Sequence, residues 1–189
     1  MPPPSARLTG LPPVVGPDPR VLILGSFPSV ISLEKKEYYA NPRNRFWHLV
    51  EALLGIKAQL PYHVRTVQLK MKGIALWDVT RECEREGSDD AAIKNEVLND
   101  IPGFLRDHPT VSVVILNGKR AGGIFHRHFH DGAPGPAGSR GRPGGEGALW
   151  TWIPGIMILT LPSTSPANAR FGLPQLEDAW GVLKESGAK

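Results

Sequence analysis

Four short apolar runs divide the chain, and polar or turn-forming residues follow each of them directly. Short apolar runs that end in this way are typical of strands buried in a parallel sheet. The predicted strands are Val21–Leu24, Gly73–Leu76, Val111–Leu116 and Ile156–Leu161. The dipeptides that follow them are Gly-Ser, Trp-Asp, Asn-Gly and Pro-Ser, respectively.

Helical patterns lie between these runs. In Arg45–Leu54 the apolar residues recur with the period of an amphipathic helix. Further helices are predicted at Ala91–Leu98, Asp100–Asp107, Lys119–His130 and Pro174–Glu185. Strands that alternate with helices favour an α/β fold. We therefore expect a three-layer α/β/α sandwich around a short, mostly parallel four-stranded sheet.

The length of 189 residues suits one domain with a single core. We expect this domain to span residues 20–189, with a Pro-rich, extended segment before it at residues 1–19. Residues Asp131–Gly147 are rich in Gly and Pro and nearly lack apolar side chains, which predicts a flexible surface loop. Arg140 and Arg142 in this loop either contact a phosphate backbone or belong to a solvated insertion.

The composition of the chain excludes some kinds of site and favours some cellular locations. Cys83 is the single cysteine, which excludes an intrachain disulfide and a metal cluster held by several thiolates. This favours a reducing compartment, and we expect a cytoplasmic protein near the nucleoid, or a nuclear one in a eukaryote. No apolar run approaches the roughly 20 residues that span a bilayer. The first residues lack the apolar core of a secretory signal, so we expect no membrane contact.

Candidate chemistry gathers where the predicted strands end. In an open α/β sheet, ligands bind in the crevice outside the carboxyl ends of the strands. The segments at these ends are GSFPS (25–29), WDV (77–79), NGK (117–119) and PSTSPANAR (162–170). The GSFPS loop either directs backbone N–H groups at a ligand or serves packing, and Asp78 is either a pocket residue or a turn former. A net charge of +4 is compatible with a polyanionic ligand but does not demonstrate one.

Two polar segments beside this crevice have both a structural and a functional interpretation. Asn44 lies directly before the Arg45–Leu54 pattern, where a helix cap belongs, and its amide could also act on a ligand. Ser163, Thr164 and Ser165 stand between two prolines. Their hydroxyls suit hydrogen bonds to phosphate oxygens, although the same residues form ordinary Ser/Thr turns.

Together these motifs resemble the uracil-DNA glycosylase superfamily, and within it the hypoxanthine-DNA glycosylase family. The resemblance extends from about Arg20 to the C-terminus, without the 131–147 loop. The segments that carry it are VLILGSFPSVISLEKKEYYANPRNRFW, GIALWDV with CEREGS, VVILNGKRA and LPSTSPANA. It implies a short parallel sheet between helices and a damaged base that is flipped into a pocket at the strand ends.

The resemblance also implies roles for individual residues. Several branches of the superfamily carry an Asp or Asn that acts on the attacking water at the place of Phe27, whereas the hypoxanthine branch uses the asparagine that matches Asn44. The implied catalytic residue is therefore Asn44, and Tyr39 would stack on the flipped base. The implied base-pocket residues are Gly25, Ser26, Phe27, Pro28, Tyr39 and Asn117. The implied DNA-binding residues are Ser163, Thr164, Ser165, Asn168 and Arg170, with Arg170 and Phe171 as candidates to fill the gap in the duplex.

The expected activity is hydrolysis of the N-glycosidic bond of a deaminated base by a monofunctional enzyme of base excision repair. An asparagine does not titrate, so we expect Asn44 to position water rather than act as a general base. Hypoxanthine is the first choice of base, with uracil and xanthine open. The alternatives are a uracil-preferring glycosylase of the same fold and a non-catalytic nucleic-acid-binding or nucleotide-binding module. We expect a monomer that acts on double-stranded DNA, with single-stranded DNA as the alternative partner.

No cofactor and no metal is expected. His126 and His130 have the i, i+4 spacing of zinc ligands on a helix, but no third ligand is evident from the sequence. Lys35 and Lys36 lie near the expected site, and Schiff-base chemistry would require one of them to be desolvated. We therefore expect incidental histidines and no lyase activity.

Overall fold

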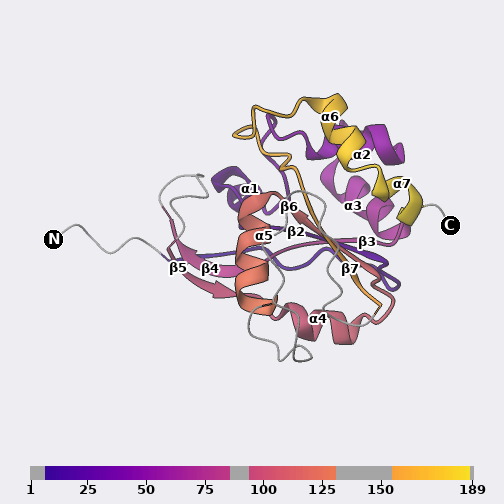
Figure 1. The fold of residues 1–189 in the computed structure, drawn as a ribbon. Helices are drawn as coiled ribbons and strands as arrows, with labels where there is room; N and C mark the ends of the chain where they lie inside the picture. Colours follow the sequence, from indigo (N-terminus) through magenta and orange to yellow (C-terminus); the bar gives the residue numbers. More distant parts are fainter. Residues whose placement is uncertain (1–6, 86–93, 131–154, 188–189) are drawn as a thin grey trace.

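The computed structural model describes residues 7–85, 94–130 and 155–187 of the chain (Figure 1). The predicted loop at 131–147, with Arg140 and Arg142, lies outside the described residues. Within the described ranges, no helix is long and apolar enough to cross a membrane.

The central sheet contains four strands that all run parallel. They are β2 (Val21–Gly25), β3 (Ile74–Asp78), β6 (Val113–Asn117) and β7 (Met157–Leu161). Their spatial order is β3-β2-β6-β7, and every neighbouring pair is parallel. The strands match the four predicted apolar runs with shifts of one or two residues at their ends. The predicted parallel sheet is confirmed.

Helices cover both faces of this sheet, because alternate side chains of a strand point to opposite faces. Val21 and Ile23 pack into one buried cluster, and Leu22 and Leu24 pack into another. The first cluster includes side chains from α2 (Phe46–Leu54), α3 (Tyr62–Met71), α6 (Leu173–Ala179) and α7 (Val182–Gly187). The second includes side chains from α4 (Ile101–Asp107) and α5 (Lys119–Phe125). Figure 1 shows the two groups on either side of the sheet, which confirms the three-layer sandwich.

A second, antiparallel sheet lies beside the sandwich and was not predicted. It consists of β1 (Arg7–Thr9), β4 (Thr80–Glu84) and β5 (Lys94–Leu98) in the order β1-β4-β5. The helix predicted at Ala91–Leu98 is therefore wrong for residues 94–98, while residues 91–93 lie outside the described part. Pairing of β5 with β4 outweighs the weak helical preference of this short segment.

Three helical segments also differ from the prediction. The sequence pattern did not reveal α1 (Val30–Lys35), which spans six residues, or α3. A single helix was expected at Pro174–Glu185, but Trp180 and Gly181 separate α6 from α7. Residues 126–130 continue α5 as a π-helical turn, so the predicted Lys119–His130 region is helical throughout.

Candidate active site

The carboxyl ends of the four parallel strands meet at a cavity of about 310 Å³. This volume is at the lower end of the roughly 300–1,000 Å³ that is typical of small-molecule sites. The cavity suits a nucleobase with part of its sugar better than a large cofactor. The lining residues are Gly25, Ser26, Phe27, Pro28, Ser29, Ser32, Tyr38, Tyr39, Asn44, Asp78, Asn117, Ser163, Thr164, Ser165 and Ala167.

Gly25 and Asp78 form the end of the β2–β3 pair, where they lie opposite each other in register. A Cβ atom placed on Gly25 would lie 2.4 Å from Oδ1 of Asp78. Gly25 is therefore required here by close approach of a side chain, and its φ lies outside the left-handed region. Asp78 is 4% exposed and faces the cavity, so the interpretation of this residue as a pocket residue is confirmed.

The loop after β2 forms one wall of the cavity. Phe27 is buried, and the guanidinium carbon of Arg85 lies 5.0 Å from the centre of its ring. Arg85 also donates from Nη2 to the carbonyl oxygen of Pro28 at 2.7 Å. At the end of the loop, Oγ of Ser29 accepts from the backbone N–H of Ser32 and caps α1. The apolar ring of Phe27 thus lines this wall of the cavity, and the buried guanidinium of Arg85 packs against it.

Tyr39 has an unusual backbone and a packed ring. Its φ is 56°, in the left-handed region that side chains with a Cβ atom rarely adopt. The ring stacks on Phe46 with centroids 3.8 Å apart and an interplanar angle of 19°. One face of Tyr39 is therefore covered, and a base could stack only on the other face. Strained backbone of this kind is held in place by its surroundings and is often found at functional sites.

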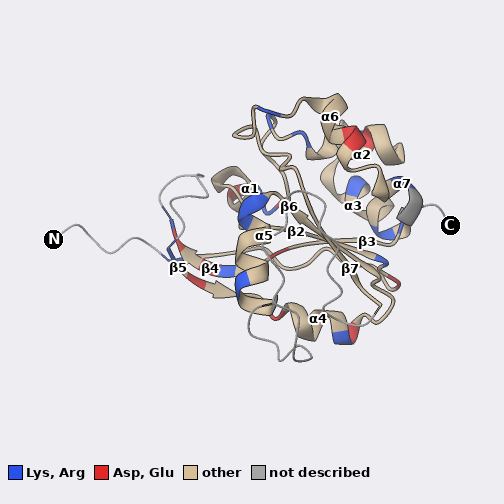
Figure 2. Cartoon of the chain, in the orientation of Figure 1, with Lys and Arg blue, Asp and Glu red and all other residues tan. Residues whose placement is uncertain are grey.

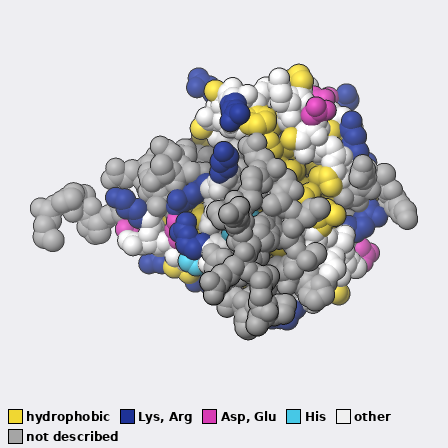
Figure 3. Space-filling model, in the orientation of Figure 1, with side chains coloured by type: hydrophobic (Ala, Val, Ile, Leu, Met, Phe, Trp, Pro, Cys, Tyr) yellow, Lys and Arg dark blue, Asp and Glu magenta, His cyan; other side chains and the backbone are white. Residues whose placement is uncertain are grey.

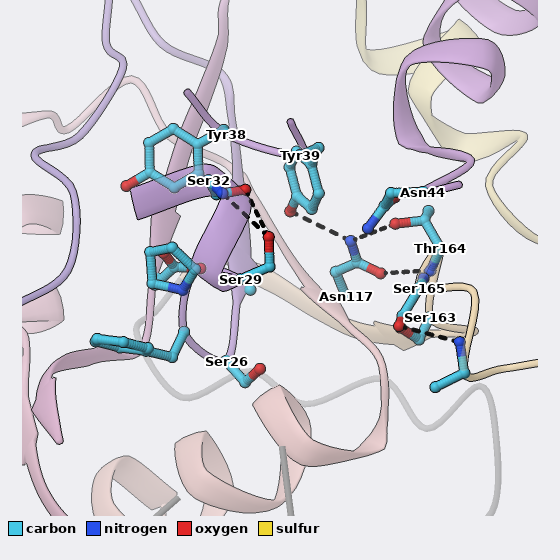
Figure 4. A pocket seen from close by; sticks show the side chains of 15 residues that line it. Ser26, Ser29, Ser32, Tyr38, Tyr39, Asn44, Asn117, Ser163, Thr164 and Ser165 are labelled. Atoms are coloured by element: carbon cyan, nitrogen blue, oxygen red, sulfur yellow. Dashed lines mark hydrogen bonds between the residues drawn. The ribbon is translucent and has the colours of Figure 1, made fainter. Parts of the chain in front are cut away.

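Asn117 connects Tyr39 to the loop after β7 (Figure 4). Its Nδ2 donates to the hydroxyl oxygen of Tyr39 at 3.2 Å and to Oγ1 of Thr164 at 3.0 Å. Its Oδ1 accepts from the backbone N–H of Thr164 at 3.0 Å. Both N–H donors of this amide are therefore used within the protein. The geometry favours Asn117 as a link between the two walls over direct contact with a base edge.

Asn44 lies in the wall of the cavity just before α2. Its Oδ1 accepts from the backbone N–H of Phe46 at 3.0 Å. The cap position expected for Asn44 is wrong by one residue, because the N-cap of α2 is Arg45, but Asn44 still binds the first N–H group of the helix. This bond fixes which end of the amide is oxygen, because an N–H can be donated only to the oxygen. No described residue accepts from Nδ2. This hydrogen bond orients the side chain, with its amide nitrogen and one oxygen lone pair left for a ligand.

The loop after β7, residues 163–171, contains the predicted DNA-binding residues. Oγ of Ser163 accepts from the N–H of Ser165, and Oγ of Ser165 accepts from the N–H of Ala167. Each hydroxyl hydrogen is consequently left to donate to an acceptor such as a phosphate oxygen. Thr164 is fully buried, whereas Nδ2 of Asn168 donates to the carbonyl of Ser163 at 2.9 Å. Thr164 and Asn168 therefore shape the loop from within.

Arg170 lies on the far side of this loop, beside a second cavity of about 330 Å³. Lys119 and Phe171 line the same cavity, and Arg170 is exposed. Lys and Arg occur in the loops before α2 and before α6 (Figure 2). Residues of the first loop line the first cavity, and residues of the second loop line both cavities. On the face visible in Figure 3, however, Lys and Arg side chains are spread out and form no single basic patch.

The sequence did not reveal several residues that shape the site. Ser32 and Tyr38 line the cavity, while Arg45 and Arg85 hold its loops. Ser32 and Tyr38 lie within the segment that resembles known glycosylases, so their position offered a signal. Nothing in the sequence indicates that Arg45 contacts a segment about 120 residues away.

The remaining candidates lie apart from the cavity. Lys35 and Lys36 are exposed and do not line it, so neither has the desolvated environment that a Schiff-base lysine requires. Nε2 of His126 lies 3.4 Å from Oγ1 of Thr160. Among the residues that the structure describes, no group of three or more His, Cys, Asp or Glu side chains could hold a metal ion.

The three tyrosines of the chain lie in or beside this site, and all have raised pKa values. Burial is the largest cause for each, and the nearby Asp78 carboxylate adds to it. We expect Tyr38 and Tyr39 to form almost no tyrosinate at pH 10, where an unfolded tyrosine is half ionised, and Tyr62 to be less than half ionised there. Because the unfolded state loses its protons first, stability should decline as pH rises above about 10. Ultraviolet difference spectra with and without denaturant check this, and ionisation of two or more tyrosines near pH 10 in the folded protein would contradict it.

Comparison with known proteins gives consistent results. The family model of the uracil DNA glycosylase superfamily matches residues 12–184. A protein named hypoxanthine DNA glycosylase from Methanosarcina barkeri is 40% identical over 115 residues, which are 60% of this chain and 72% of the relative. A protein of the same name from Methanosarcina acetivorans is 40% identical over 114 residues, with the same shares. A solution NMR structure from M. acetivorans, named as a candidate uracil DNA glycosylase, superposes with a TM-score of 0.74 at 30% identity and covers 96% of this chain and 99% of its own.

Proposed function

Because the chain belongs to the uracil DNA glycosylase superfamily, we propose that it is a monofunctional DNA glycosylase that removes hypoxanthine from deoxyinosine in double-stranded DNA. The observation that carries this proposal is the placement of Asn44 in the same cavity as Tyr39 and the loop after β7. The names of the two relatives that are 40% identical support hypoxanthine as the base. We further propose that the enzyme acts as a monomer in the compartment that holds the cell's DNA.

The cavity supports recognition of a base that has left the duplex. Extrusion of a base costs a few kcal/mol, and less when the base is mispaired. Stacking on the face of Tyr39 that Phe46 does not cover would return about 1–3 kcal/mol. Asp78 would accept a hydrogen bond from N1–H of hypoxanthine and disfavour adenine, whose N1 is itself an acceptor. Because uracil also presents an N–H beside a carbonyl, this contact does not separate the two deaminated bases.

The proposed reaction is hydrolysis. The bond between N9 of the base and C1′ of the sugar breaks with its electron pair on the base, and a water oxygen bonds to C1′ of the cationic sugar. The departing purine takes up one proton, and the attacking water loses one. Asn44 would hold this water through the lone pair of Oδ1 that the Phe46 N–H leaves free. A neutral amide adds no titration of its own, so the water is positioned rather than deprotonated by it.

Two further features support the details of the proposal. The exposed Lys35 and Lys36 favour hydrolysis without a covalent lysine intermediate. The free hydroxyl hydrogens of Ser163 and Ser165 suit contacts with phosphates, whereas the buried Thr164 would act on the loop from inside. The phosphate contacts would position the DNA backbone, and the cavity would read the base.

The test is incubation of the protein with labelled duplexes that carry one dI, dU or dX, followed by alkali. We expect cleavage at dI, with a single-turnover rate at least about tenfold higher than at dU. A duplex with dA at the same place is the control and should remain intact. Faster cleavage at dU would instead favour a uracil-preferring glycosylase, and no cleavage of any damaged duplex would contradict the enzymatic function.

A further inference from the structure

Arg45 makes an unusual set of contacts with the loop at residues 163–171. Its backbone N–H donates to the carbonyl of Thr164 at 3.0 Å, and its Nε donates to the same oxygen at 3.4 Å. Its Nη2 donates to the carbonyls of Ser165 and Asn168, and its Nη1 donates to the carbonyl of Phe171. One side chain thus binds four backbone carbonyls spread over eight residues of a loop that has no regular secondary structure.

We propose that Arg45 is the positioning residue of this loop, which it holds in the conformation that receives the DNA backbone. The proposal rests on the proposed function in one respect, because it takes the loop to bind phosphate. It adds a residue that acts through Ser163 and Ser165 rather than on the substrate itself. The following observations support it.

The direction of the carbonyls determines the direction of the amides. In a trans peptide the C=O of one residue and the N–H of the next point in opposite directions. When the carbonyls of Thr164 and Asn168 turn toward Arg45, the N–H groups of Ser165 and Ala169 turn away from it. The Ser165 N–H is the donor that holds Oγ of Ser163. Arg45 therefore sets the orientation of the hydroxyl that is available to a phosphate.

The chemistry of the contact requires arginine rather than any cation. A guanidinium carries five N–H donors in a rigid planar fork, and four of them are used here by carbonyls that lie in different directions. A lysine ammonium has three donors around one atom and cannot reach all four oxygens. Among the described residues no carboxylate forms an ion pair with Arg45, so its positive charge is not neutralised beneath the loop.

Arg45 also ties the loop to the proposed catalytic residue. It follows Asn44 directly in the chain, and both lie at the start of α2. Any displacement of the loop relative to Asn44 would have to break hydrogen bonds of Arg45. The phosphate contacts and the catalytic amide are thereby held at a fixed separation, although they are about 120 residues apart in the sequence.

The experiment compares Arg45→Met, Arg45→Lys and the control Arg106→Met, which removes an exposed cation on α4. Single-turnover rates with a dI duplex are measured against enzyme concentration, and affinity for a duplex with a tetrahydrofuran abasic site is measured separately. We expect both Arg45 variants to raise the half-saturating concentration about tenfold or more, with a maximal rate within about threefold of wild type. The Arg106 variant should resemble wild type.

The lysine variant gives the decisive comparison. It keeps the charge, and it keeps the experiment interpretable if the methionine variant does not fold. Full rescue by lysine would mean that charge alone matters and would overturn the positioning role. Unchanged half-saturation in either folded Arg45 variant would overturn it as well. If the wild-type protein binds the abasic duplex but cleaves none of the damaged ones, the proposed activity fails, while the loss of abasic-site affinity in the variants still tests Arg45.

Discussion

Substitution of Asn44 by alanine should lower the single-turnover rate on a dI duplex by about 10²–10³ while DNA binding is retained. This is the typical loss when one preorganised group of an active site is removed. The same substitution removes the cap on the Phe46 N–H, which should lower stability by about 1 kcal/mol. Rates are therefore compared well below the thermal midpoint of the variant, where the loss of the cap leaves the protein folded.

Asn44→Asp separates the two roles of this side chain. A carboxylate keeps an acceptor both for the Phe46 N–H and for a water, and it removes the Nδ2 donor. If the oxygen positions the water, Asn44→Asp should be within about tenfold of wild type and far more active than Asn44→Ala. A folded Asn44→Asp that is as inactive as Asn44→Ala would show that the NH₂ group is needed, against water positioning by the oxygen. Asn95→Ala, at an exposed asparagine of β5, is the control and should have the wild-type rate.

Gly25→Ala should lower kcat/KM by about 10², although it adds a single methyl group. The new Cβ atom would lie 2.4 Å from Oδ1 of Asp78, which must move or push β2 and β3 apart. A displacement of about 1 Å in an active site can reduce the rate on this scale. Because the φ of Gly25 is not in the left-handed region, backbone strain adds nothing, and the effect arises from the contact with Asp78.

The matched control is Gly123→Ala in α5. A Cβ atom there meets nothing within 4 Å, and the residue lies inside a helix. Alanine should therefore increase the free energy of unfolding by about 0.5–1 kcal/mol and leave kcat/KM unchanged. Steady-state kinetics and thermal unfolding of the two variants check both expectations. A Gly25→Ala protein with wild-type kcat/KM would mean that Asp78 can move without consequence for the reaction.

The sequence was sufficient to predict the parts of the molecule that depend on the local pattern of apolar and polar residues. The apolar runs predicted the four central strands, and the rule for strand ends placed Gly25, Asn44 and Ser163 near one crevice. That rule works because all four strands are parallel and therefore bring their carboxyl ends to one edge. The site residues that follow a strand could be predicted for the same reason.

The parts that failed depend on contacts between distant segments. Residues 94–98 contain no pattern that distinguishes a short helix from a strand. Their pairing with β4 determines that they form a strand. The sequence assigned no contact to Arg45 or Arg85, and their carbonyl partners become visible only in the folded chain. Asn117 lines the cavity, as expected, but its bonds to Tyr39 and Thr164 become visible only in the folded chain.

The side-chain amide of Asn117 has both of its N–H donors bonded within the protein, and this affects how the cavity would bind a substrate. Every donor of this side chain is already used, and it joins two walls of the cavity before any ligand is present. A site built in this way has little conformational freedom left to lose when a ligand enters. Most of the conformational entropy lost on binding would then be that of the nucleotide that leaves the DNA duplex. Discrimination among lesions should accordingly follow the ease with which each damaged pair opens, so that weakly paired lesions are captured first even where their contacts in the cavity are alike.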